Sequence, residues 1–222
     1  MPVIVKGEML VKAIVFYLDS ELPSEVKFLL EDFRLAVNNA IRAGLQARVT
    51  SRNALVKIAY KDFRQEHPGM YSQHLVQAFE VTCGILKNHR KRLRKGVTCR
   101  IPYVKRLMMK AANQAYKLDR TSGVIDLPIR AGCHVELRLI VGQYHRKYLD
   151  DMTLSLGSLT VLPDRVIVAF RKDAPKPYTP DSVISLDTNE RSLDGVFVEG
   201  DVAKAVKAEF PEVAIIQQRH HR

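Results

Sequence analysis

The sequence predicts an α+β protein in which a β-barrel is interrupted by an inserted helical bundle and followed by a shorter α/β segment. Three features of the 222-residue chain support this prediction. Residues 20–118 carry apolar side chains at helical spacing, residues 119–172 alternate apolar and polar side chains, and a strand-like run precedes both. A polar stretch with three prolines in six residues then separates these parts from the C-terminal segment.

The first part, residues 1–19, is expected to supply the opening strand of the barrel, because residues 9–18 are rich in β-branched and aromatic side chains. The inserted part, residues 20–118, is expected to form a helical bundle. Its apolar residues recur every three or four positions, as on the buried face of a helix. The expected helices are 23–47, 52–65, 71–93, which ends before Gly96, and a fourth that begins at Pro102 and carries Ala115.

Residues 119–172 are expected to complete the barrel, because short apolar–polar alternations are separated there by Gly, Asp and Pro. The expected strands are 124–129, 135–140, 153–156 and 165–170. Residues 173–181 form a proline-rich linker, and residues 182–222 form the last segment. In that segment we expect strands at 182–187 and 194–198, a helix at 202–209 and a strand at 213–216.

Basic residues outnumber acidic ones by 35 to 24, which gives a formal net charge of +11 and a calculated pI of about 9.7. The excess is concentrated, because the stretch between Glu80 and Asp119 contains no carboxylate. A solvated helix usually carries both signs of charge, so this run favours contact with nucleic-acid phosphates, and RNA and DNA are the expected partners. The candidate phosphate contacts are Lys87, Arg90, Lys91, Arg92, Arg94, Lys95, Arg100, Lys105, Arg106 and Lys110.

A second candidate site lies in residues 143–148, where aromatic and basic side chains alternate on a loop or strand edge. Tyr144, Arg146 and Lys147 are candidates for contact with RNA, since aromatic rings stack on unpaired bases and basic groups contact phosphates. An ordinary basic edge strand shows the same pattern, so both interpretations stay open.

Several other classes of protein are disfavoured. No apolar stretch is long enough to cross a bilayer, and the N-terminal residues lack a signal-peptide cleavage site. Cys83, Cys99 and Cys133 form no CxxC pair, so no zinc site is expected, and three thiols suit a reducing cytoplasm. The motifs of nucleotide-binding enzymes, serine hydrolases and zinc proteases are absent, and a small-molecule substrate is not an expected partner. Because no stretch can cross a bilayer, a membrane is not an expected partner either.

Asp187 is the candidate for metal chemistry, because it ends a short apolar strand and precedes a tight polar turn. Carboxylates in metal-dependent nucleases hold the divalent ions that activate water and neutralise the scissile phosphate. A metal pair needs two or three further carboxylates, and the neighbouring candidates are Glu190, Asp194, Glu199 and Asp201. An aspartate that hydrogen-bonds its own turn is the alternative interpretation.

The order of these parts resembles that of the TnpB (OrfB) family, transposon-encoded RNA-guided nucleases related to the type V CRISPR effectors. The opening strand, the helical insertion and the return to β-structure at residues 166–170 are similar to the family's wedge barrel and recognition lobe. Residues 183–192, VISLDTNERS, resemble the first RuvC motif in its archaeal form, and residues 219–222 resemble the start of the basic helix after it. The likeness spans this chain but only the N-terminal half of a full-length member.

The resemblance implies that residues 182–222 are the truncated start of an RNase H-like (RuvC) α/β domain, with Asp187 as its first metal-binding aspartate. It also implies that the helical part holds a guide RNA paired with target DNA. The family's later catalytic carboxylates and its zinc ribbon have no counterpart here, so the chain is expected to be catalytically incomplete. Mg²⁺ would bind at Asp187 only if other groups completed the site.

Two other interpretations stay open. The chain could be a non-enzymatic RNA-binding accessory or structural component of a ribonucleoprotein, which would carry the same basic patches. It could also be a nuclease whose missing carboxylates come from a partner chain.

Overall fold

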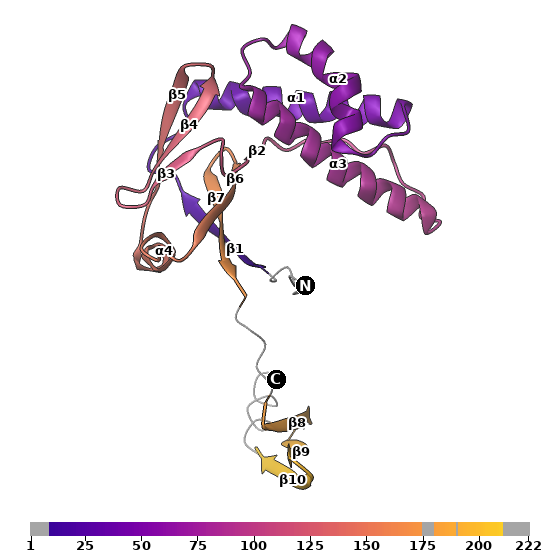
Figure 1. The fold of residues 1–222 in the computed structure, drawn as a ribbon, viewed down its shortest axis with the longest axis vertical. Helices are drawn as coiled ribbons and strands as arrows, with labels where there is room; N and C mark the ends of the chain where they lie inside the picture. Colours follow the sequence, from indigo (N-terminus) through magenta and orange to yellow (C-terminus); the bar gives the residue numbers. More distant parts are fainter. Residues whose placement is uncertain (1–8, 175–179, 190, 211–222) are drawn as a thin grey trace, which may run out of the picture. The chain divides into compact units, whose positions relative to one another are not determined.

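The computed structural model of the chain describes residues 9–174, 180–189 and 191–210. It divides into two compact units, Met1–Ala174 and Pro175–Arg222. The described residues form four helices and three antiparallel sheets, so the predicted α+β class is confirmed (Figure 1). None of the described helices is both long enough and apolar enough to span a membrane.

The first sheet of unit 1 has the strand order β1-β7-β6-β2. Its strands are β1 (Met9–Tyr17), β7 (Arg165–Asp173), β6 (Ser155–Val161) and β2 (Met109–Ala111), and all neighbours are antiparallel. One face is apolar and buried, because alternate residues of each strand point to the same side. Ile14 and Phe16 of β1 lie opposite Val168 and Val166 of β7 on that face.

The second sheet contains β3 (Lys117–Asp119), β4 (Val124–Arg130) and β5 (Cys133–Arg138), followed by helix α4 (Gln143–Leu149). One isolated bridge, Leu18 to Leu139, connects β1 with the chain just after β5. The described strands therefore form open sheets, and the expected closed barrel is wrong for this part of the chain. The three-residue strands β2 and β3 are too short to continue the hydrogen bonding around a barrel.

The helices α1 (Ser24–Gln46), α2 (Arg52–Glu66) and α3 (Ser72–Arg94) lie between β1 and β2 in the chain and confirm three of the expected helices. They pack through their apolar faces, with Leu30, Phe33, Leu75 and Phe79 almost fully buried. Gly44 lets the end of α1 approach α3, because a Cβ atom there would lie 2.5 Å from the Leu86 side chain.

The fourth expected helix is wrong, because residues 97–108 form no helix and lead instead into β2. The buried side chain of Asn38 in α1 holds this segment at Val104. Its Nδ2 donates to the Val104 carbonyl oxygen at 3.0 Å, and its Oδ1 accepts from the Val104 N–H at 2.8 Å. Both backbone groups of Val104 are thus bonded to a distant side chain and not to a helical turn.

We expect Asn38→Ala to lower the free energy of unfolding by about 2 kcal/mol, because the two backbone groups of Val104 lose their partner. Hydrogen–deuterium exchange should also become faster in residues 97–108. The matched control is Asn39→Ala at the next position, whose side chain makes no hydrogen bond within the described residues. Equal protection of residues 97–108 in both variants would contradict this role for Asn38.

Unit 2 contains a three-stranded antiparallel meander in the order β10-β9-β8. Its strands are β8 (Ser182–Thr188), β9 (Ser192–Glu199) and β10 (Val202–Glu209). The expected helix at 202–209 is therefore wrong: Gly200, with φ of 54°, turns the chain back so that Val202 pairs with Glu199. The expected strand at 213–216 lies outside the described residues.

His74 of α3 is fully buried against β4, and this gives a pH-dependent contribution to stability. Its Nε2–H donates to the Pro128 carbonyl oxygen at 2.7 Å, and its Nδ1 has no partner among the described residues. Burial lowers the pKa of His74 below its ordinary value of 6.5. Below about pH 6.5 the unfolded chain therefore binds a proton that the folded chain does not.

We expect the free energy of unfolding to fall as the pH drops below about 6.5, by up to ~1.4 kcal/mol per pH unit from this residue. Urea denaturation at about pH 7.5 and about pH 5.5 measures the change. His74→Gln keeps a donor for Pro128 but does not titrate, so its stability should change less between the two pH values. The same pH dependence in both proteins would contradict the assignment.

Candidate nucleic-acid interface

The C-terminal half of α3 concentrates most of the basic residues that the sequence analysis identified. Lys87, Arg90, Lys91, Arg94 and Lys95 follow one another at helical spacing and line one shallow hollow of about 520 Å³ together with Thr50. All five side chains are exposed. The helix therefore brings them together as a continuous basic face.

The core packing of α3 stops before this basic face. Leu86 is the last buried residue of the helix, and every residue from 90 to 98 is exposed. Figure 1 shows the last turns of α3 diverging from α1 and α2. The charges thus lie on a part of the helix that projects beyond the bundle.

The end of α3 is held by a Schellman motif around Gly96. Gly96 has φ of 72°; its N–H donates to the Leu93 carbonyl, and the Val97 N–H donates to the Arg92 carbonyl. Basic side chains in the last turn also interact favourably with the carbonyl end of the helix dipole. The predicted stop at Gly96 is confirmed, and the capping hydrogen bonds satisfy carbonyl groups at the basic end of the helix.

Arg92 and Arg100 lie on a different side of α3 from the Lys87 face. They line a hollow of about 430 Å³ with Asn88 and His89, in which residues 98–102 run back beside the helix. Arg90 lies nearly opposite Arg92 on the helix and shares a hollow of about 260 Å³ with Leu93 and with Arg48 from the chain after α1; His89 borders this hollow as well as the Arg92 hollow. Basic groups therefore flank the projecting helix on both sides.

The sequence analysis missed Arg48. It is exposed and has φ of 56°, a left-handed conformation that is uncommon for arginine and that turns the chain between α1 and α2. The sequence around Arg48 contains no basic run that would have identified it, because only the fold brings the chain after α1 beside α3.

None of the basic residues from Lys87 to Lys110 forms an ion pair within the described parts of the chain. Glu80 of α3 does form an ion pair, but with Arg52 of α2: its carboxylate lies 3.8 Å from Arg52 Nε. Glu80 precedes the basic residues of the helix. Lys105 and Arg106 are exposed in the segment that leads to β2, and Lys110 is half-buried on β2. The basic side chains are therefore available to an external anion.

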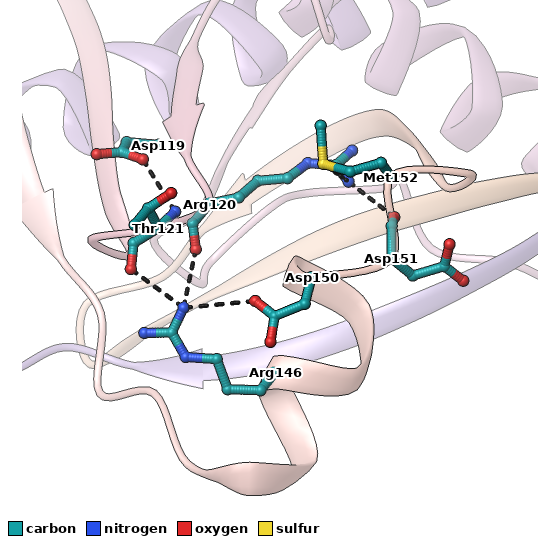
Figure 2. A network of polar contacts seen from close by, with 7 residues as sticks. All are labelled: Asp119, Arg120, Thr121, Arg146, Asp150, Asp151 and Met152. Atoms are coloured by element: carbon teal, nitrogen blue, oxygen red, sulfur yellow. Dashed lines mark hydrogen bonds and ion pairs between the residues drawn. The ribbon is translucent and has the colours of Figure 1, made fainter.

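The candidate patch at 143–148 lies on α4 and not on a strand edge, and its arginine has an internal role (Figure 2). Arg146 donates through Nη1 to the carbonyl oxygens of Arg120 and Thr121, each at 3.1 Å. The same Nη1 lies 3.6 Å from Asp150 Oδ1. The guanidinium therefore connects α4 to the turn after β3, which leaves it poorly placed to contact nucleic acid.

The two tyrosines of α4 form a cluster with β1. Tyr144 and Tyr148 meet edge to face at 5.3 Å, and Lys12 Nζ lies 5.1 Å from the Tyr148 ring centre. The Lys12 ammonium lowers the pKa of Tyr148, while the hydrogen bond with Tyr148 raises the pKa of Tyr144. Lys147 is exposed beside them. This cluster is smaller than the basic end of α3 and is partly satisfied internally.

Asp187 lies on β8 of unit 2, opposite Asp194 on β9. Asp194 is the residue that closes the turn: it accepts from Asn189 Nδ2 at 2.7 Å and from Ser192 Oγ at 2.6 Å, which lowers its pKa. No group of three or more metal-binding side chains occurs in the described residues, and Glu190 lies outside them. The structure thus brings one further carboxylate to Asp187.

Comparison with known families gives a match for part of the chain. Residues 29–125 match the Uncharacterized protein MJ0013 family. The match runs from α1 to the start of β4 and includes the whole basic face of α3. No match is found among curated proteins.

This match corrects the family expected from the sequence. Residues 29–125 match the MJ0013 family and not TnpB, so the assignment to transposon-encoded RNA-guided nucleases is wrong. The interpretation of Asp187 as a RuvC aspartate, and of residues 182–222 as the start of an RNase H-like domain, rested on that family assignment and loses its support. The concentration of positive charge on α3 does not depend on that assignment.

Proposed function

We propose that this protein binds nucleic acid through the sugar–phosphate backbone, with the basic end of α3 as its main contact surface. The observation that carries the proposal is the projecting helix end, on which five exposed basic residues line one hollow and have no carboxylate partner among the described residues. Phosphates repeat along a nucleic-acid strand, so a row of cations along one helix neutralises several of them at once.

The energetics of the site also support a polyanionic ligand. Like charges one helical turn apart destabilise a helix by a few tenths of a kcal/mol for each pair, and this face contains Lys87–Lys91, Arg90–Arg94 and Lys91–Lys95. A bound polyanion removes this repulsion. The helix is instead held by its apolar N-terminal half and by the cap at Gly96.

The hollow at the α3 face is open and shallow, which suits an extended backbone better than an enclosed small molecule. Arg100, Lys105 and Arg106 extend the positive surface along the chain that follows the helix. The surface consists mainly of cations, so the proposed binding is dominated by charge.

The proposal is tested by fluorescence anisotropy with labelled oligonucleotides over a series of salt concentrations. We expect the logarithm of the association constant to fall linearly with the logarithm of salt, with a slope that corresponds to about four to six phosphate contacts. Heparin, another polyanion, should compete. Binding that does not change with salt, or no binding to any oligonucleotide at low salt, would contradict the proposal.

A further inference from the structure

The projecting end of α3, residues 87–95, carries positive charge on both sides of its Lys87 face, and we call this helix end the ridge. Two residues advance about 200° around a helix, so Arg90 and Arg92 leave it in nearly opposite directions. Arg90 faces the hollow shared with Arg48, and Arg92 faces the hollow shared with Arg100. Lys87, Lys91 and Lys95 lie between them on the helix, around the shallow hollow of the Lys87 face.

We infer that this ridge enters the major groove of double-stranded B-form DNA. The inference rests on the proposed function and specifies its ligand. A groove has a phosphate wall on each side, so a helix within it contacts two strands at once, one on each flank. Positive charge on both flanks of α3 matches that arrangement, whereas one extended strand lying along the helix needs only a single stripe.

The dimensions agree with this ligand. A helix with its side chains is about 10–12 Å across, and the B-DNA major groove is about 12 Å wide. From Leu86, the last buried residue, to Arg94, the helix runs about 12 Å, which is two turns free of the core. The major groove of A-form RNA is too narrow to admit a helix, so duplex RNA does not fit the ridge.

The composition of the ridge disfavours a single strand. Proteins that hold single strands place aromatic rings where successive bases stack. Between Phe79 and Tyr103 the chain has no phenylalanine, tyrosine or tryptophan. The ridge therefore has cations for the backbone but no platform for unpaired bases.

The first experiment compares four labelled probes of one sequence: duplex DNA, duplex RNA, single-stranded DNA and single-stranded RNA. A fifth probe is the DNA duplex with glucosylated 5-hydroxymethylcytosine, whose sugars fill the major groove. We expect duplex DNA to bind at least about tenfold more tightly than each of the others at equal salt. Equal affinity for duplex RNA or single strands, or no effect of glucosylation, would overturn the inference and leave nucleic-acid binding intact. Binding to none of the probes would overturn both.

The second experiment tests the two flanks separately. With duplex DNA, Arg90→Ala and Arg92→Ala should each reduce the slope of log affinity against log salt by about 0.9, since each removes a phosphate contact. The matched control is Arg42→Ala, which removes an exposed arginine from α1 and should leave the slope unchanged. A reduced slope in only one of the two flank variants would place a single strand along one side of the helix and overturn the inference.

Discussion

Replacing both Lys87 and Lys91 by glutamate is expected to weaken nucleic-acid binding on the order of 100-fold at moderate salt, because it removes two phosphate contacts and adds two repulsive charges. The slope of log affinity against log salt should also fall by about 2. Both side chains are exposed and one turn apart, so the helix should keep its structure. Fluorescence anisotropy gives the affinity, and far-UV circular dichroism checks the fold.

The chain offers a closely matched control for this charge reversal. Lys57 and Lys61 have the same spacing on α2, are also exposed and make no ion pair within the described residues. Lys57→Glu with Lys61→Glu changes the net charge of the protein by the same amount. We expect the control to lose much less affinity, because its charges act only over a distance and are screened by salt. An equal loss in both variants would show that net charge, and not the α3 face, determines binding.

The basic face was open to prediction from sequence because it is local. Residues 87–95 lie on one helix, so their spacing alone places Lys87, Lys91 and Lys95 on a common face. The same periodicity predicted α1, α2 and α3, whose apolar stripes are wide and whose ends have proline or glycine signals. For such helices, the spacing of apolar residues alone predicts both the helix and the face that it buries.

The errors arose where distant residues decide the local structure. Asn38 holds Val104 across 66 positions of sequence, and no local pattern reveals that bond. The alanine-rich run 202–209 suits a helix by propensity, yet it pairs with β9 along its whole length. Charge on both sides of the α3 ridge was equally hidden, because Arg48 reaches it only through the packing of α1 against α3.

The family assignment failed for a different reason. A strand, a helical insertion and a further set of strands is an arrangement that many unrelated proteins share, so the order of parts carries little functional information. The motif around Asp187 is short, and the fold places only Asp194 opposite it. The positive surface of α3, in contrast, is a property of the residues themselves and holds whichever family the chain joins.

Arg146 is expected to act in folding and not in binding, and Arg146→Ala tests that distinction. Its guanidinium donates to the carbonyl oxygens of Arg120 and Thr121, so its removal should lower the free energy of unfolding by about 2 kcal/mol. The neighbouring side chain of Arg120 donates to the Asp151 carbonyl, so α4 and the loop after it should both lose protection from hydrogen exchange (Figure 2).

Lys147→Ala is the matched comparison on the same helix, because Lys147 is exposed and makes no hydrogen bond within the described residues. We expect it to leave stability nearly unchanged. Urea denaturation separates the two variants, and anisotropy with duplex DNA gives the salt slope of each. A reduced slope in Arg146→Ala with normal stability would contradict the internal role, because it would mean that the guanidinium leaves the turn after β3 to contact phosphate.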